Sequence, residues 1–457
     1  MKFSGLCFSY VFQVLKISME KSQYPKVLIT SIGRINAADS SNNGMLLRNL
    51  FSSWPKRNIA QIFSSDDNGD EGFLRHYYQL GPRERRMGAL FYKLKAGVHA
   101  TDHQKTDLGG LNRNRSSSTR IKAVLLRYFV DTGLYELVFR PKLSTQLLRW
   151  VREFKPDIIF AQGYCLTFTW LPVMLAEVLR SSVAFFCSDD WPTYIYTGFL
   201  GEPTMFSWFM RKVSLAAVNR LMDRVDIPFA FCEPMAREYR TRYARHFVTL
   251  SHADDPERFD RAEPIRIHAA EVFCILAAGY FNKHRWPLLL DANECCCRLN
   301  THGFRARIVV LSSGIAPEGR AALEEAQFID IVEDPGNDLL PGYLKGADLL
   351  FLAEGFDQGF VSAIRLSVSS KAHLFMFSKR PVIVYAHPQT GVSQYAMQYA
   401  WAKVVDKRDV DCLHEAIHSL LGNTDERRRL LSNADTVATR FHLRDANQAL
   451  FRSSLSY

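Results

Sequence analysis

Short apolar segments with strand character alternate with helical segments along most of this chain, and the alternation begins again after a polar stretch. Strands separated by helices pair in parallel, and the helices then cover both faces of the sheet. The polar stretch is residues 251–264, which is broken by Pro256 and Pro264. A chain of 457 residues has room for two domains. The sequence therefore predicts an α/β protein with two parallel sheets.

The expected elements fall into two sets, one on each side of the polar stretch. The first set has strands at residues 26–31, 58–63, 157–161 and 183–187 and helices beginning at Gly44 and spanning 143–154. The second has strands at 272–277, 306–311, 328–332, 349–352 and 381–385 and helices at 285–299, 341–345, 370–377 and 411–421. We expect an N-terminal extension at 1–24, Rossmann-like domains at 25–255 and 265–430 facing each other across a cleft, and a helical tail at 431–457.

Two segments stand outside this alternation. Residues 98–119 are polar and small and lack an apolar period, which predicts a mobile surface loop. Residues 1–18 contain a Lys and a short apolar stretch but no small-residue cleavage site, so they are a weak match to a signal peptide. An over-extended start before Met19 or a short helix touching a membrane explains them equally well.

Composition excludes several classes of protein. Hydrophobic residues at 47% and charged residues at 23% are typical of soluble globular proteins, and no apolar run reaches the ~18 residues of a membrane-spanning helix. The net charge of +10 suits nucleic acid, an anionic membrane or an anionic small molecule, but no nucleic-acid-binding motif is present. The nine cysteines lack metal-ligand spacing, so we expect reduced thiols in a cytoplasmic protein and no metal.

A succession of short motifs has the order and spacing of a known family. In the second half these are residues 343–352, 356–357, 365–371 and 379–385; earlier and later segments in the same register are 189–192, 231–243 and 409–441. Together they resemble GT-B glycosyltransferases, especially the retaining family 4 type (glycosyl transferases group 1), in a divergent form. The resemblance covers about residues 25–445.

This resemblance implies a function and its partners. It implies transfer of a sugar, as by a retaining hexosyltransferase, from a nucleotide-sugar donor held by the C-terminal domain. The acceptor would be a glycan or lipid-linked glycan at the N-terminal domain, in surface polysaccharide synthesis. Cations and helix N-termini would neutralise the departing diphosphate without a metal or another cofactor. The net positive charge adds the expectation that the protein contacts the inner face of an anionic membrane peripherally.

The resemblance also assigns site residues. The expected donor-binding residues are Gly279, Asn282, Lys283, Arg365, Lys371, Asn43 and Gly44. Lys371 is the first candidate for the phosphates, because the two serines before it can cap a helix that faces them. Gly279 would let the backbone approach phosphate. Each has a structural alternative: a solvated lysine at a helix start for Lys371, a surface salt bridge for Arg365, and plain turns for the glycines.

The expected catalytic residues are Asp189 and Asp190, which follow a strand and would orient the sugar or act on the acceptor proton. The alternative is a helix N-cap before Trp191. Leu374 stands where the family has a Glu that binds the nucleotide ribose. Either a divergent branch of the family or a catalytically degenerate scaffold that partners an active glycosyltransferase explains this departure. A sugar-nucleotide epimerase, which shares the two-domain shape, is a third interpretation.

Overall fold

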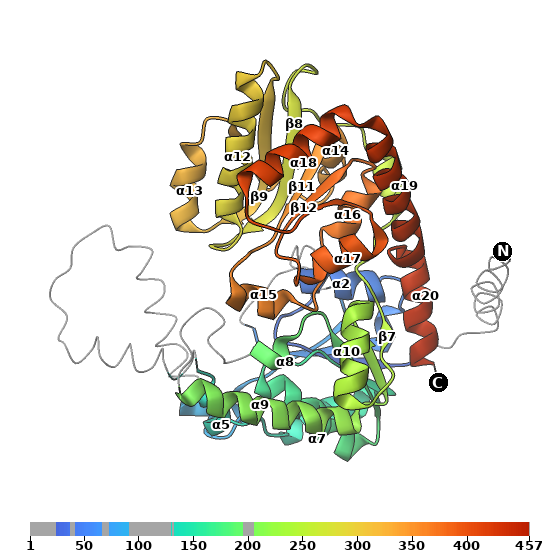
Figure 1. Ribbon diagram of the computed structural model, residues 1–457. Helices are drawn as coiled ribbons and strands as arrows, with labels where there is room; N and C mark the ends of the chain where they lie inside the picture. The colour runs from blue at the N-terminus through green and yellow to red at the C-terminus, as the bar shows by residue number, and fades with distance from the viewer. Residues whose placement is uncertain are drawn as a thin grey trace.

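The computed structural model describes residues 24–36, 42–65, 73–90, 129, 132–194 and 205–456, of which 42, 43, 45, 205 and 206 are described by their backbone only. The expected surface loop at 98–119 and nearly all of the expected extension at 1–24 lie outside the described residues. Figure 1 shows the described chain as two α/β domains, with the earlier segments in blue to green and the later ones in yellow to red.

The first domain is built on a seven-stranded sheet in which every pair of neighbouring strands is parallel. In spatial order the strands are β3 (His76–Gln79), β2 (Ile59–Phe63), β1 (Val27–Thr30), β4 (Ile158–Ala161), β5 (Ser182–Cys187), β6 (Ile227–Ala230) and β7 (Val248–Thr249). The central strands β1 and β4 are buried along their whole length, as expected where helices cover both faces.

The second domain has a six-stranded parallel sheet. Its order is β10 (Ile329–Glu333), β9 (Ala306–Ile315), β8 (Phe273–Phe281), β11 (Leu349–Ala353), β12 (Val382–Tyr385) and β13 (Lys403–Val405). The predicted α/β class with two Rossmann-like domains is confirmed.

Helices lie between most successive strands in both domains. The first has α2 (Asn42–Phe51), α5 (Leu134–Val138), α6 (Thr145–Phe154), α7 (Leu166–Leu179), α8 (Trp191–Tyr194), α9 (Met205–Arg224) and α10 (Glu233–Tyr243), with 3-10 turns at Lys56–Asn58 and Pro82–Glu84. The second has α11 (Pro256–Arg261), α12 (Trp286–Thr301), α13 (Pro317–Glu324), α14 (Leu340–Gly346), α15 (Gln358–Ile364), α16 (Ala372–Phe377), α17 (Gly391–Tyr399), α18 (Val410–Gly422) and α19 (Thr424–Phe441), followed by α20 (Arg444–Leu455). Among the described residues, no helix has the length and apolar character to cross a membrane.

The last helix returns to the first domain. The expected boundary at residue 430 falls within α19, and α20 then packs against α2. Phe451 on α20 is fully buried and makes edge-to-face ring contacts with Phe51 and Phe160, with centroids 5.0 and 5.7 Å away. The C-terminal tail therefore completes the core of the N-terminal domain.

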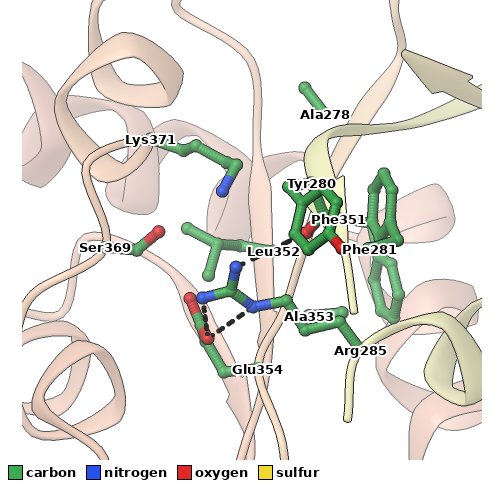
Figure 2. A pocket seen from close by; sticks show the side chains of 10 residues that line it. All are labelled: Ala278, Tyr280, Phe281, Arg285, Phe351, Leu352, Ala353, Glu354, Ser369 and Lys371. Carbon is green, nitrogen blue, oxygen red and sulfur yellow. Dashed lines mark hydrogen bonds and ion pairs between the residues drawn. The ribbon is translucent and has the colours of Figure 1, made fainter. Parts of the chain in front are cut away.

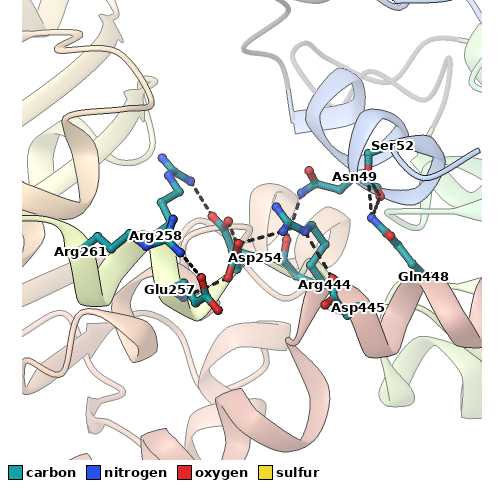
Figure 3. Close-up of polar contacts among 11 residues, drawn as sticks. Asn49, Ser52, Asp254, Glu257, Arg258, Arg261, Arg444, Asp445 and Gln448 are labelled. Carbon is teal, nitrogen blue, oxygen red and sulfur yellow. Dashed lines mark hydrogen bonds and ion pairs between the residues drawn. The ribbon is translucent and has the colours of Figure 1, made fainter. Parts of the chain in front are cut away.

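The two chain crossings between the domains lie side by side (Figure 3). The amide of Asp254, in the first crossing, donates to the carbonyl of His442 at 3.0 Å, and the amide of Arg444 donates back to Asp254 at 3.0 Å. The Arg444 guanidinium also contacts Asp255 at 2.9 Å. This backbone pairing joins the linker to the α19–α20 junction, and we call the two paired crossings the hinge.

Candidate active site

A small pocket opens at the carboxyl ends of β8 and β11, beside the start of α16 (Figure 2). In open α/β sheets this edge is where ligands bind. The pocket is lined by Ala278, Tyr280, Phe281, Arg285, Phe351, Leu352, Ala353, Glu354, Ser369 and Lys371. Two cationic side chains and one carboxylate therefore share a largely apolar pocket.

Arg285 and Glu354 form an ion pair in this pocket. Arg285 immediately precedes α12, and Glu354 immediately follows β11. The Arg285 Nε and Nη2 groups donate to Glu354 Oε2 at 2.9 and 2.6 Å (Figure 2). The side chains are 19% and 4% exposed. Because the pair is largely buried, it holds the guanidinium in a fixed position at the carboxyl ends of the strands.

Lys371 lies opposite this pair, at the residue before α16, and its ammonium points into the pocket (Figure 2). Burial and the nearby positive charge of Arg285 lower the pKa of Lys371 from its ordinary value of 10.5 to about 8, and Glu354 opposes that shift. The ammonium is thus held, poorly solvated, beside another cation. Such a site gains from an anionic ligand, which restores the balance of charge.

Gly279 makes room for Lys371. Its φ of +123° is a conformation that side-chain-bearing residues rarely adopt, and a Cβ at this position would lie 2.0 Å from Cε and 2.7 Å from Nζ of Lys371. The backbone of β8 therefore approaches the lysine side chain directly. Gly279 and Lys371, predicted as donor-binding residues, are brought together.

The two predicted catalytic aspartates differ in their surroundings. Asp190 is buried and forms an ion pair with Arg242 of α10 at 2.7 Å, while it accepts a hydrogen bond from the Tyr239 hydroxyl at 2.7 Å. Asp189 accepts a hydrogen bond from the Trp191 amide at 3.1 Å. Burial raises the pKa of Asp189 to about 6, although the hydrogen bonds from Tyr194 and Trp191 act to lower it. Asp190 thus anchors α10 through its ion pair, whereas no ion pair among the described residues involves Asp189, which is therefore the better candidate for a chemical role.

The other predicted residues are not part of the pocket lining. Asn282 Oδ1 accepts the His284 amide at 3.0 Å, which shapes the turn before α12, and Lys283 is exposed. Arg365 is the C-cap residue of α15, and its Nη2 group lies 3.5 Å from Oε1 of Glu238 in the other domain. Asn43 and buried Gly44 lie in the first turn of α2, where a turn preceding the helix was expected.

Sequence reasoning missed the role of Arg285. The family register placed the cation of this loop at Lys283, two residues earlier. The one local signal was the position of Arg285 directly before Trp286-Pro287, where proline marks the first turn of a helix. Glu354 was not among the predicted site residues. Its pairing with Arg285 joins residues 69 apart in the chain.

Leu374, at the position where the family has an acid, has a packing role. Leu374 is partly buried and packs against the main hydrophobic core. The neighbouring His373 is buried and stacks between His252 and His442, with centroids 5.7 and 5.8 Å away. No carboxylate on α16 therefore faces the pocket, and Glu354 is the acid within its lining.

Comparison with known proteins identifies the fold. No family model and no curated protein matches the chain. Solved structures match over nearly the whole length: sucrose-phosphate synthase from Thermosynechococcus elongatus (TM-score 0.59, 12% identity, 93% of this chain and 96% of that one); WaaG, a glycosyltransferase involved in lipopolysaccharide biosynthesis (0.56, 12%, 93% and 98%); and Anabaena HepE in complex with UDP-glucose (0.60, 8%, 95% and 100%).

These neighbours share the arrangement of two facing parallel-sheet domains described above. The chain has the GT-B fold, as the sequence motifs indicated. At identities of 8–12% this likeness shows the fold alone.

Proposed function

We propose that the protein is a glycosyltransferase that takes a sugar from a nucleotide-sugar donor bound at the pocket of Lys371, Arg285 and Glu354. The observation that carries the proposal is the packing of Lys371 against Gly279 beside the Arg285–Glu354 pair, which sets two cations where a diphosphate would lie. Neighbours of this fold include a glycosyltransferase of lipopolysaccharide biosynthesis and a protein bound to UDP-glucose.

The chemistry assigns a task to each group. As the bond between the sugar anomeric carbon and the diphosphate oxygen breaks, that oxygen takes the electron pair, and Lys371 and Arg285 stabilise the resulting charge. The acceptor hydroxyl bonds to the anomeric carbon and loses its proton. Asp189, with a pKa of about 6, is mostly ionised at neutral pH and is the residue proposed to orient the acceptor or receive that proton. This proposal needs no metal or cofactor.

The finer assignment follows the motif resemblance. We propose a retaining hexosyltransferase that acts in the cytoplasm on a glycan or lipid-linked glycan, in surface polysaccharide synthesis. The test is release of nucleoside diphosphate when the protein is incubated with UDP-, GDP- or ADP-linked hexoses and a lipid-extract acceptor. Release that requires one donor supports the proposal, and no release from any donor argues against it.

Leu374 favours a second candidate, a catalytically degenerate GT-B scaffold that partners an active glycosyltransferase. A leucine accepts no hydrogen bond from a ribose hydroxyl, so the contact that the family acid makes to the ribose is absent at this position. The scaffold predicts that a nucleotide sugar stays intact in the presence of the protein, whether or not it binds. The turnover assay above separates the two candidates.

The affinity for a diphosphate ligand should fall as pH rises above about 8. Lys371 is protonated below that pH and loses its charge above it, so we expect up to ~10-fold weaker binding per pH unit until the pKa of the bound state is reached. The free energy of unfolding depends on pH in the opposite direction. Between about pH 8 and 10.5 the Lys371 side chain is protonated in the unfolded chain but largely deprotonated in the folded one, so its contribution to the free energy of unfolding rises with pH in this range. Calorimetric titration with UDP from pH 7 to 9.5 measures the predicted fall in affinity, and a Lys371→Ala variant should show no such fall.

Gly279→Ala should damage the pocket more than the same change at another glycine. The new methyl group would clash with Lys371 Cε in addition to straining the backbone, so we expect at least ~10-fold weaker UDP binding and a lower melting temperature. Gly303→Ala is the matched control, because Gly303 also has a positive φ (+87°) but meets nothing within 4 Å. Equal UDP affinity in the two variants would contradict this account of Gly279.

Peripheral membrane contact is proposed at α9. Trp208 and Phe209 are 60% and 46% exposed, and the Lys212 ammonium lies 4.0 Å from the centroid of the Trp208 ring system. Exposed aromatic and basic side chains are typical of helices that lie on anionic membranes. We expect cosedimentation with phosphatidylglycerol vesicles to fall several-fold in a Trp208→Ala/Lys212→Ala variant. Equal sedimentation with phosphatidylcholine vesicles would contradict an electrostatic contact.

A further inference from the structure

A second cavity, of about 600 Å³, lies at the hinge between the domains. Its walls come from α10 and β7 on one side and from α16, α17, α19 and α20 on the other. Its apolar lining includes Phe231, Phe247, Val368, Tyr395 and Leu450. We call this cavity the hinge groove. Its volume falls within the range of about 300–1,000 Å³ that small-molecule sites occupy, so it can hold a ligand.

The rim of the hinge groove is basic. Arg240 on α10 and Arg440 on α19 are exposed and line the same cavity, together with exposed His246. Within the described part of the chain, neither arginine forms an ion pair. The one acidic residue of the lining, Glu233, accepts a hydrogen bond from Thr249 at 3.2 Å. The groove thus joins an apolar interior to an entrance with unneutralised positive charge.

A column of three histidines closes the inner side of the groove. His252, His373 and His442 stack, and His442 Nε2 lies 2.9 Å from the Tyr395 hydroxyl. Burial lowers the pKa of His252 to about 3 and of His442 to about 4, and it lowers that of His373 as well. These rings are therefore neutral at physiological pH, and they extend the uncharged wall of the groove.

The hinge groove is distinct from the pocket of Lys371 but adjoins it. Ser369 lines both cavities, and His373 lies two residues beyond Lys371. The groove is also lined by His252 and His442, which belong to the two chain crossings. An occupant of the groove would consequently contact both crossings and the segment that carries Lys371.

We propose that the hinge groove binds an amphipathic anion, a molecule with an apolar chain and one phosphate or carboxylate head. The chain would lie against Phe231, Phe247 and Tyr395, and the head would pair with Arg240 and Arg440 at the rim. This chemistry is shared by fatty acids and by lipid phosphates. The site does not depend on the proposed sugar transfer.

Dodecyl phosphate and dodecanoate are the probes, and displacement of the fluorescent anion 8-anilinonaphthalene-1-sulfonate from the full-length protein reports their binding. We expect both to bind below their micellar concentrations, whereas inorganic phosphate and uncharged dodecyl maltoside do not. The stronger of the two probes identifies the head group. Failure of both to bind would overturn the proposal.

Two variants locate the site. Arg240→Ala/Arg440→Ala should weaken dodecyl phosphate at least ~10-fold by removing two charged hydrogen-bonding partners, and Arg237→Ala, an exposed change on the same helix outside the lining, should not. Ala446→Trp places a large ring at the exposed edge of the groove and should abolish binding with an unchanged melting temperature. Unchanged affinity in either variant would overturn the assignment. UDP affinity in the double arginine variant should equal that of the wild type, which separates this site from the pocket of Lys371.

Discussion

Lys371→Ala is expected to lower kcat/KM for sugar transfer by about 10²–10³-fold, because it removes one of the two cations proposed to stabilise the departing diphosphate. Arg285 remains in place through its pair with Glu354, so some activity should persist. The effect belongs mainly to kcat if the lysine acts on charge that develops as the bond breaks, and to KM if it only holds the donor. Initial rates over a range of donor concentrations separate these cases.

The matched control for this experiment is Lys379→Ala. Lys379 lies just beyond the other end of α16, is exposed, and pairs with Asp260 at 3.0 Å. Removing it changes the net charge by the same amount without touching the pocket. Similar losses in both variants would show that overall charge, and not the position of Lys371, determines the rate.

Asp190→Ala is expected to lower the free energy of unfolding by about 3–5 kcal/mol, since it leaves the Arg242 guanidinium without its buried partner and the Tyr239 hydroxyl without its acceptor. Chemical denaturation measures this change. Asp189→Asn keeps the shape of the side chain and should leave stability within about 1 kcal/mol while reducing the transfer rate.

The contrast between the two aspartates decides their roles. If Asp190→Ala proves as stable as the wild type, the anchoring role assigned to its ion pair is wrong. If Asp189→Asn transfers sugar at the wild-type rate, Asp189 takes no part in the chemistry. The sequence alone treated the pair as equivalent, because both follow the same strand.

Much of the fold was predictable because buried parallel strands are continuous apolar runs. The segments that became β1, β4, β5, β8 and β11 were all expected within a few residues of their ends. The strand β3, with the sequence HYYQ and exposed ends, and the two-residue β7 carry no such run and were not predicted. The strand β6, which contains Pro228, and the three-residue β13 were also not predicted. The return of α20 to the first domain depends on aromatic packing between distant segments, which local pattern does not reveal.

The site was predictable only in part, for a similar reason. The motif register led to Lys371 and Gly279, which contact each other although 92 residues separate them. Arg285 pairs with Glu354, and Asp190 with Arg242. Those pairings depend on where strand ends meet in space, so sequence spacing alone could not supply them. The hinge groove, assembled from six elements, had no sequence signal.

Isothermal titration calorimetry of the wild-type protein and of Lys371→Ala with UDP-, GDP- and ADP-hexoses tests the central claim most directly. We predict that the wild type binds one of these donors and that the nucleoside with the same base, which lacks the phosphates, binds at least ~10-fold more weakly. Lys371→Ala should lose at least ~10-fold in donor affinity, as expected for a charged contact to phosphate. Binding of no donor by the wild type, or equal binding by the variant, would contradict the assignment of this pocket to the donor diphosphate.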